Sequence, residues 1–313
     1  MSGIKRMLVY VDQNADNTRL LQKTRQLASG GDMQVELFCT AYSSALHQSY
    51  LFDKKAEEYA EHGYVKSVEA KLDNYAGELR VQGIACGVDV YWERHAIEGL
   101  VRKALRFEPD IVIYPLSHTH GFLDLITGDT NWKLIQQCPA LLFLSHDRIW
   151  QWPPRIAACV DPFHNCEQPE ELDHEVLVTT RQLSEQYRAE MEVVHCFHTL
   201  PQSAIFDEHV VTDYKALQQQ VRQKHKAELD QLLASYNLSL SNPLVHLLEG
   251  EAHKLLPAYV KEREVDLLVM GQVPRGLLDH LLTGSTIERV LSELDADVLV
   301  VKPPGFVCPA EDT

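Results

Sequence analysis

Apolar and polar positions along the chain fall into two kinds of segment. Short runs rich in β-branched residues, typical of buried strands, alternate with longer segments in which apolar residues recur at helical spacing. In the first half we expect strands over 7–11, 34–40, 88–92, 111–114 and 141–144, with helices between them, the longest over 54–82. This alternation predicts an α/β fold with a parallel sheet and crossover helices.

The second half of the chain repeats the first at an offset near 156 residues. MLVYVD at 7–12 matches IAACVD at 156–161, and TRQLA at 24–28 matches TRQLS at 180–184. The segment YKALQQQVRQKHKAELDQLLASY, residues 214–236, supplies a second long helix. Such a repeat predicts two tandem doubly wound domains, each with a five-stranded parallel sheet and helices on both faces.

The segment HDRIWQWPPR, residues 146–155, connects the two copies. Its two tryptophans and paired prolines are typical of a short, stiff connector. We therefore expect domains at 1–148 and 149–313. A length of 313 residues agrees with two domains of ordinary size.

Composition and charge narrow the classes of function. Hydrophobic residues make up 45% and charged residues 24%, and no apolar run is long enough to cross a bilayer. The N-terminal apolar stretch is too short for a secretory signal, so we expect a cytoplasmic protein without a membrane span. With 29 Lys and Arg against 45 Asp and Glu, the net charge of -16 repels phosphate backbones, and we expect no nucleic-acid partner. Seven cysteines without a CxxC pair predict reduced thiols.

Candidate ligand-binding residues follow the first and fourth strands of the second half. In doubly wound sheets a ligand binds beyond the carboxyl ends of the strands, where the strand order reverses. Asp161 and Pro162 follow the first strand there, Gly271 follows the fourth, and Gly284-Ser285-Thr286 precedes a helical pattern. Glycines and a helix start favour a phosphate. The same Gly-Ser-Thr, with Glu288, also fits a helix cap, so both interpretations stay open.

These residues resemble the universal stress protein family. Two such copies in one chain, with DTNWKLIQQCP in the first half and the VVKPPGF ending, are similar to the tandem E-type members of bacteria. Nucleotide-binding members carry GxxGx9G followed by Ser or Thr, which holds the phosphates of ATP, while the strand-one aspartate lies near the adenosine. The resemblance implies that Gly271, Gly284 and Ser285, with Asp161, hold one ATP-like nucleotide in the second domain.

The chain departs from this motif in both halves. Pro274 replaces the middle glycine and has no amide hydrogen to donate, although Gly276 could restore a close approach and Arg275 could add charge. In the first half Pro115 and His118 stand at the two glycine positions, and Gly128 is followed by Asp129, which would repel phosphate. We interpret the first half as a copy whose nucleotide motif is degenerate.

The segment SHTH in the first half contains two candidate metal ligands. His118 and His120 have imidazoles suited to zinc, and Asp12 should lie at the same edge of the sheet. No third and fourth ligand is evident, so no metal-binding residue is assigned and the presence of a metal stays open.

Three functions fit these features. We favour a stress-response protein that binds a nucleotide or another phosphate-containing or amphipathic ligand and acts through protein contacts. One alternative is a slow ATP hydrolase, although no Walker lysine motif GxxxxGK[ST] and no catalytic residue can be named. The other is a structural module with vestigial pockets. Single-domain members of the family pair their last strands in a dimer, so we expect the two halves to pack as a pseudo-dimer, with a protein partner or a second copy of the chain possible.

Overall fold

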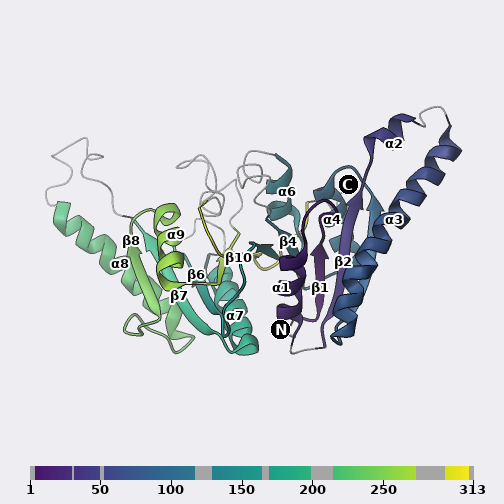
Figure 1. Ribbon diagram of the computed structural model, residues 1–313. Coiled ribbons are helices and arrows are strands. Elements are labelled where there is room, and N and C mark those ends of the chain that lie inside the picture. The colour runs from purple at the N-terminus through teal and green to yellow at the C-terminus, as the bar shows by residue number, and fades with distance from the viewer. Residues whose placement is uncertain are drawn as a thin grey trace. The chain divides into compact units, whose positions relative to one another are not determined.

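The computed structural model describes residues 4–29, 32–49, 53–116, 129–163, 169–198, 214–272 and 293–309. Side chains are described in the same ranges except for 129–132 and 169–170. The chain forms two compact units (Figure 1). The first contains Met1–Trp150 together with Gly305–Thr313, and the second contains Gln151–Pro304.

The first unit is built on a five-stranded parallel sheet. Its strand order is β3-β2-β1-β4-β5. All five strands expected from the apolar runs are present, and only the start of the third differs by more than two residues. The strands are β1 (Arg6–Tyr10), β2 (Gln34–Ala41), β3 (Ala85–Trp92), β4 (Ile111–Pro115) and β5 (Leu141–Ser145).

Helices connect these strands on both faces of the sheet. Right-handed crossovers place the β1–β2 and β2–β3 connections on one face and the two later connections on the other. Accordingly, α1 contacts α3, and α4 contacts α6. The Asp53 side chain caps α3 by accepting from the Ala56 amide at 3.1 Å. The helices are α1 (Thr18–Ala28), α2 (Ser44–Ser49), α3 (Lys54–Val81), α4 (Ala96–Phe107) and α6 (Asp129–Gln137).

The second unit has the same topology. Its parallel strands lie in the order β8-β7-β6-β9-β10, which matches β3-β2-β1-β4-β5 of the first unit strand for strand. The predicted doubly wound α/β fold is thus confirmed. The elements are β6 (Arg155–Cys159), α7 (Pro169–Tyr187), β7 (Glu190–Phe197), α8 (Tyr214–Ala234), β8 (Val245–Glu249), α9 (Ala252–Arg263), β9 (Leu267–Gly271) and β10 (Asp297–Val301).

The residues around the connector each pack within their own unit. Trp150 is buried in the first unit, with its ring 6.1 Å from that of Phe143. Trp152 packs edge-on against Tyr187 of the second unit at 6.0 Å and is 54% exposed. The last described residues return to the first unit, where the buried Cys308 thiol donates to the Gln137 carbonyl at 2.9 Å.

The cysteines in the described residues are free thiols. None of these six cysteines forms a disulfide, and burial raises the pKa of the Cys196 thiol to about 12. Such a thiol is protonated and unreactive at neutral pH. Among the described helices, none combines the length and apolar character needed to span a membrane.

Candidate functional site at the carboxyl ends of the strands

Asp161 and Gly271 lie at the same edge of the second sheet. Strands β6 and β9 pair in parallel, with Cys159 opposite Met270. Gly271 is the last residue of β9, and Asp161 follows the end of β6 by two residues. Strand order reverses between β6 and β9, so these residues flank the crevice in which doubly wound folds bind ligands. Pro162 follows in the same turn.

The turn after β6 is held by two carboxylates. The Asp161 amide donates to Asp173 Oδ1 of α7 at 3.1 Å, and Asp161 Oδ1 accepts from the Phe163 amide at 3.2 Å. Asp173 is 1% exposed, whereas Asp161 is exposed. The Asp161 carboxylate is therefore oriented by its own turn and lies at the surface of this edge.

Gly271 is explained by packing within the second unit. A Cβ at this position would lie 2.7 Å from Leu172 Cγ and 2.8 Å from its Cδ2. Leu172 of α7 is 1% exposed, so it has little room to move away. A glycine is needed here for close contact between helix and strand. The sequence had suggested the approach of a phosphate for this residue, and helix packing is a different reason for a glycine.

A lysine lies beside Gly271 at the same edge. The Gln272 amide donates to the Val301 carbonyl at 2.8 Å, and the Lys302 ammonium donates to the Gln272 side-chain oxygen. Gln272 is 5% exposed, so its amide group is a fixed support for the lysine. Sequence reasoning missed Lys302, although its place directly after the last strand was a usable signal.

Two stacked histidines lie beside the Asp161 turn. His195 of β7 is fully buried, and its Nδ1 donates to the Val160 carbonyl at 3.0 Å. Its Nε2 lies 2.9 Å from Nδ1 of His225 in α8. Because a carbonyl only accepts, the proton on His195 is at Nδ1, and a neutral His225 must donate from its own Nδ1 to His195 Nε2. Burial and the neighbouring His195 lower the pKa of His225 to about 4, against the opposing charge of Asp161.

Aromatic rings surround His225. Its ring centroid lies 4.2 Å from Phe163 and 4.6 Å from Phe197, and the Lys224 ammonium lies 5.6 Å from the Phe163 ring. These rings form an aromatic wall next to Asp161. Sequence reasoning gave no role to His225 or Phe163.

The corresponding edge of the first unit is filled differently. Tyr10, the last residue of β1, and Tyr114, the next-to-last residue of β4, stack with their centroids 5.3 Å apart. The Tyr10 hydroxyl bonds to Thr40 at 3.2 Å, and burial together with Asp12 raises the pKa of Tyr114 to about 12. Asp12 keeps the turn geometry, since its Oδ1 accepts from the Asn14 amide at 2.9 Å. The second unit has Cys159 and Met270 at the two tyrosine positions.

Several residues singled out in the sequence lie outside the described residues. Asp129 begins α6, but its side chain is not described. The others are Pro274, Arg275, Gly276, Gly284, Ser285 and Thr286 in the second half, and His118, His120 and Gly128 in the first.

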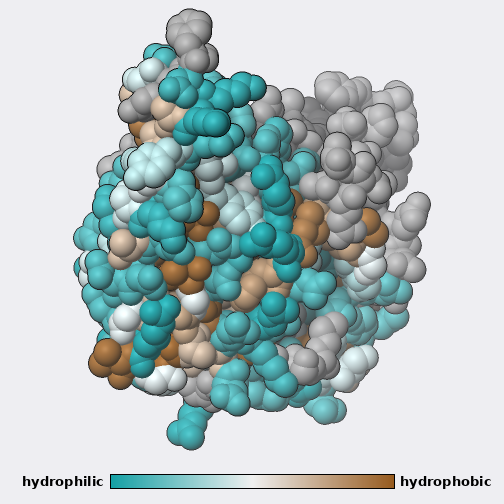
Figure 2. All heavy atoms as spheres, turned by 90° about the vertical axis from the view of Figure 1, so that its right-hand side faces the viewer, coloured by the Kyte–Doolittle hydropathy of each residue, from teal (hydrophilic) through white to brown (hydrophobic). Residues whose placement is uncertain are grey.

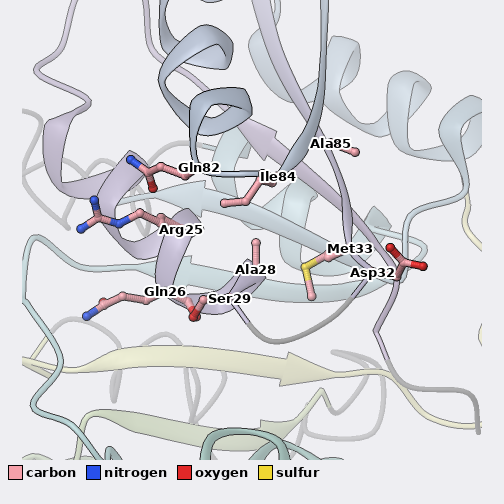
Figure 3. Close-up of a pocket in the computed structure, with 10 residues that line it drawn as sticks. Arg25, Gln26, Ala28, Ser29, Asp32, Met33, Gln82, Ile84 and Ala85 are labelled. Carbon is pink, nitrogen blue, oxygen red and sulfur yellow. The ribbon is translucent and has the colours of Figure 1, made fainter.

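Each unit also has an open cavity at the opposite, amino-terminal edge of its sheet. In the first unit it has a volume of about 430 Å³ and lies where α1 ends and β2 and β3 begin (Figure 3). Its lining includes Arg25, Ser29, Asp32, Met33, Gln82 and Ile84. In the second unit it has a volume of about 580 Å³ and is lined by Trp152, Arg155, Arg188, Glu190 and Glu264 among others. Neither includes a residue that the sequence had suggested for ligand binding.

Comparisons with known proteins agree with this architecture. Residues 155–302 match the model of the Universal stress protein family. "Universal stress protein E" of Photorhabdus laumondii is 21% identical over 312 residues, and that of Escherichia coli K12 is 22% identical over 323 residues. Each alignment covers 99% of this chain and 98% of the relative.

Solved structures show the same fold. A Pseudomonas aeruginosa protein of unknown function has a TM-score of 0.71 at 20% identity, covering 96% of this chain and 93% of its own. A universal stress protein from Archaeoglobus fulgidus has a TM-score of 0.60 at 14% identity, covering 95% of this chain and 96% of its own. The second unit thus matches the Universal stress protein family, and over nearly its whole length the chain is similar to universal stress proteins of bacteria.

Proposed function

We propose that this chain is a stress-response ligand-binding protein that acts through protein contacts. In this proposal its second unit binds an ATP-like nucleotide, or another small phosphate-containing or amphipathic ligand, at the edge that holds Asp161. The observation that carries the proposal is the difference between the two units at the point where strand order reverses. Stacked tyrosines occupy that point in the first unit, and a cysteine and a methionine stand there in the second.

The Asp161 turn supports recognition of a nucleoside. Its exposed carboxylate, oriented through the Phe163 amide, has acceptor sites for ribose hydroxyls or an exocyclic amine. The half-buried ring of Phe163, backed by His225 at 4.2 Å, provides an aromatic face on which a base can stack.

The region around Gly271 supports binding of phosphate. Lys302, supported by Gln272, brings a positive charge to the end of β9. We propose that Arg275 and Gly276, together with Gly284, Ser285 and Thr286 at the helix start expected from the sequence, complete the phosphate site. Pro274 removes one amide donor from the family motif, so affinity should be about tenfold to a hundredfold below that of a complete motif.

One observation favours the alternative of a vestigial pocket. Leu172 packs directly on Gly271, so the first glycine of the motif has a structural use that needs no ligand. The proposed site therefore depends on Asp161 and the aromatic wall more than on Gly271.

A matched pair of aspartate variants tests the proposal. Asp161→Asn keeps the acceptor for the Phe163 amide but removes the charge, and Asp12→Asn makes the same change in the first unit. In calorimetry with ATP on the full chain we expect no more than one site. Asp161→Asn should weaken binding by about tenfold or more and Asp12→Asn should leave it unchanged. Two equal sites, or equal effects of the two variants, would overturn the proposal. Native mass spectrometry of the purified protein would identify a co-purifying ligand other than ATP.

A further inference from the structure

A histidine and two glutamates meet where α2 packs against α3 in the first unit. His47 lies on α2, and Glu57 and Glu61 lie one turn apart near the start of α3. Residues four apart project from the same face of a helix, so both carboxylates can face the imidazole. The surface on this side of the unit is mostly hydrophilic, with small hydrophobic areas between (Figure 2). This group is distinct from the candidate nucleotide site, which lies in the second unit.

The ligand atoms of these three residues are already close together. His47 Nδ1 lies 2.7 Å from Glu57 Oε1. One ligand atom from each of the three residues lies within 4.8 Å of the other two. Within the described part of the chain, this is the one group of three His, Cys, Asp or Glu residues with such geometry. An ordinary ion pair would account for His47 and Glu57, but it leaves Glu61 unexplained.

The Trp92 side chain at the end of β3 belongs to the surroundings of Glu61. Trp92 is itself packed between aromatic rings, 5.4 Å from Tyr42 and 6.0 Å from Tyr64. An apolar, packed shell of this kind controls the access of solvent to a metal site.

The group also has an excess of negative charge. Glu57, Glu58 and Glu61 lie close together near the start of α3, so their carboxylates repel one another. A divalent cation among His47, Glu57 and Glu61 would relieve this repulsion.

We propose that His47, Glu57 and Glu61 form a binding site for a divalent transition-metal ion, with Zn²⁺ as the best fit. One imidazole nitrogen and two carboxylate oxygens are ligands that Zn²⁺ accepts, and imidazole favours transition metals over Mg²⁺ and Ca²⁺. Three protein ligands leave a coordination position for water or for a group from another molecule. The site would link the short helix α2 to α3.

Calorimetry with Zn²⁺ on the untagged, reduced full chain tests the site. We expect a site on the wild type that His47→Ala and Glu61→Gln each weaken by more than about tenfold. Glu58→Gln removes a carboxylate charge from the residue directly after Glu57, and His62→Ala removes an imidazole from the residue directly after Glu61. Each of these controls should change the affinity less than about twofold. No binding by the wild type, or equal loss in the ligand and control variants, would overturn the proposal.

Two further measurements separate this site from adventitious binding. Co²⁺ bound at a site of nitrogen and oxygen ligands gives visible absorption without a thiolate charge-transfer band in the near ultraviolet. Such a band, retained in His47→Ala, would assign the metal to cysteines and overturn the proposal. Glu57→Gln removes the carboxylate charge that lies 2.7 Å from His47, so it should weaken Zn²⁺ binding by more than about tenfold. An unchanged affinity would overturn the proposal.

Discussion

Leu172 packs against the backbone of Gly271, with its Cγ 2.7 Å from where a Cβ at position 271 would lie. Gly271→Ala should therefore destabilise the second unit by about 1–3 kcal/mol, because the buried leucine must shift or the strand must move. Urea unfolding of the full chain, followed by circular dichroism, measures this change.

A second substitution distinguishes packing from other effects at Gly271. Leu172→Ala on its own should cost about 2–5 kcal/mol through the cavity that it leaves. In the double variant the added methyl occupies part of that cavity, so Gly271→Ala should then cost little or even stabilise. Strictly additive effects of the two substitutions would contradict the packing explanation.

A buried glutamate supports the second unit away from the candidate site. Glu192 of β7 is fully buried and accepts from the Arg263 guanidinium at 2.9 Å and from the Tyr259 hydroxyl. Burial alone would raise the pKa of Glu192, but these hydrogen bonds outweigh it and the pKa is lowered. Arg263→Met should thus destabilise by about 1–3 kcal/mol, since Tyr259 remains as a partner and Arg263 is partly exposed.

Arg222→Met is the matched control for Arg263→Met. Arg222 pairs with Glu249 on the same unit, but their side chains are 55% and 31% exposed. Its loss should cost less than about 1 kcal/mol in the same urea experiment. A similar cost for both arginines would mean that burial of Glu192 is unimportant.

Glu192 also makes stability depend on pH. Because its carboxylate is stabilised in the folded state, the stability that Glu192 contributes is fully present above its unfolded pKa and is lost as the pH falls through its folded pKa.

The sequence was a good guide to the strands, because each buried strand has its own run of apolar residues. Buried runs such as 111–114 and 141–144 predicted strands because parallel strands are apolar on both faces. The start of β3 was placed three residues late, since Ala85, Cys86 and Gly87 carry little strand signal. They are extended because they pair with residues 34–36 of β2. The short helix α2 was not expected, because six residues are too few for a periodic pattern.

The candidate site was predictable only in part. Asp161 and Gly271 follow from topology, because the carboxyl ends of neighbouring parallel strands meet at one edge. The contact of His195 with His225 joins a strand to a helix 30 residues later. The contact of Leu172 with Gly271 joins residues that are far apart in the sequence. Such pairs depend on the register of helix against sheet, which hydrophobic period does not determine.

The His195–His225 pair makes stability of the second unit depend on pH. The pKa of His225 is lowered from 6.5 to about 4, chiefly by burial and by His195. Between these values the unfolded chain binds a proton that the folded chain does not, so stability should fall as pH decreases through that range and level off below it. Because His225 is partly exposed, the loss should be about 1–2 kcal/mol.

Histidine NMR titration measures the pKa of His225 directly, with His225→Gln to assign its signal. Glutamine can still donate to His195 Nε2, so this variant should keep the contact while losing the titration. Its stability should therefore fall less than that of the wild type between neutral pH and pH of about 4. A His225 signal that titrates near the ordinary histidine value would refute the proposed proton arrangement.

The last prediction concerns the phosphate side of the proposed nucleotide site. If the helix start at Gly284 and Ser285 holds phosphate, Gly284→Val should abolish ATP binding, because a branched side chain blocks the approach to the amides. Pro274→Gly should tighten binding by roughly tenfold to a hundredfold, since it restores one charge-assisted amide donor worth on the order of 1.5–3 kcal/mol. Calorimetry with ATP on the wild type and both variants measures these changes. A site indifferent to Gly284→Val would leave Gly-Ser-Thr as a helix cap, and the ligand would then have to be sought at the Asp161 turn and its aromatic wall alone.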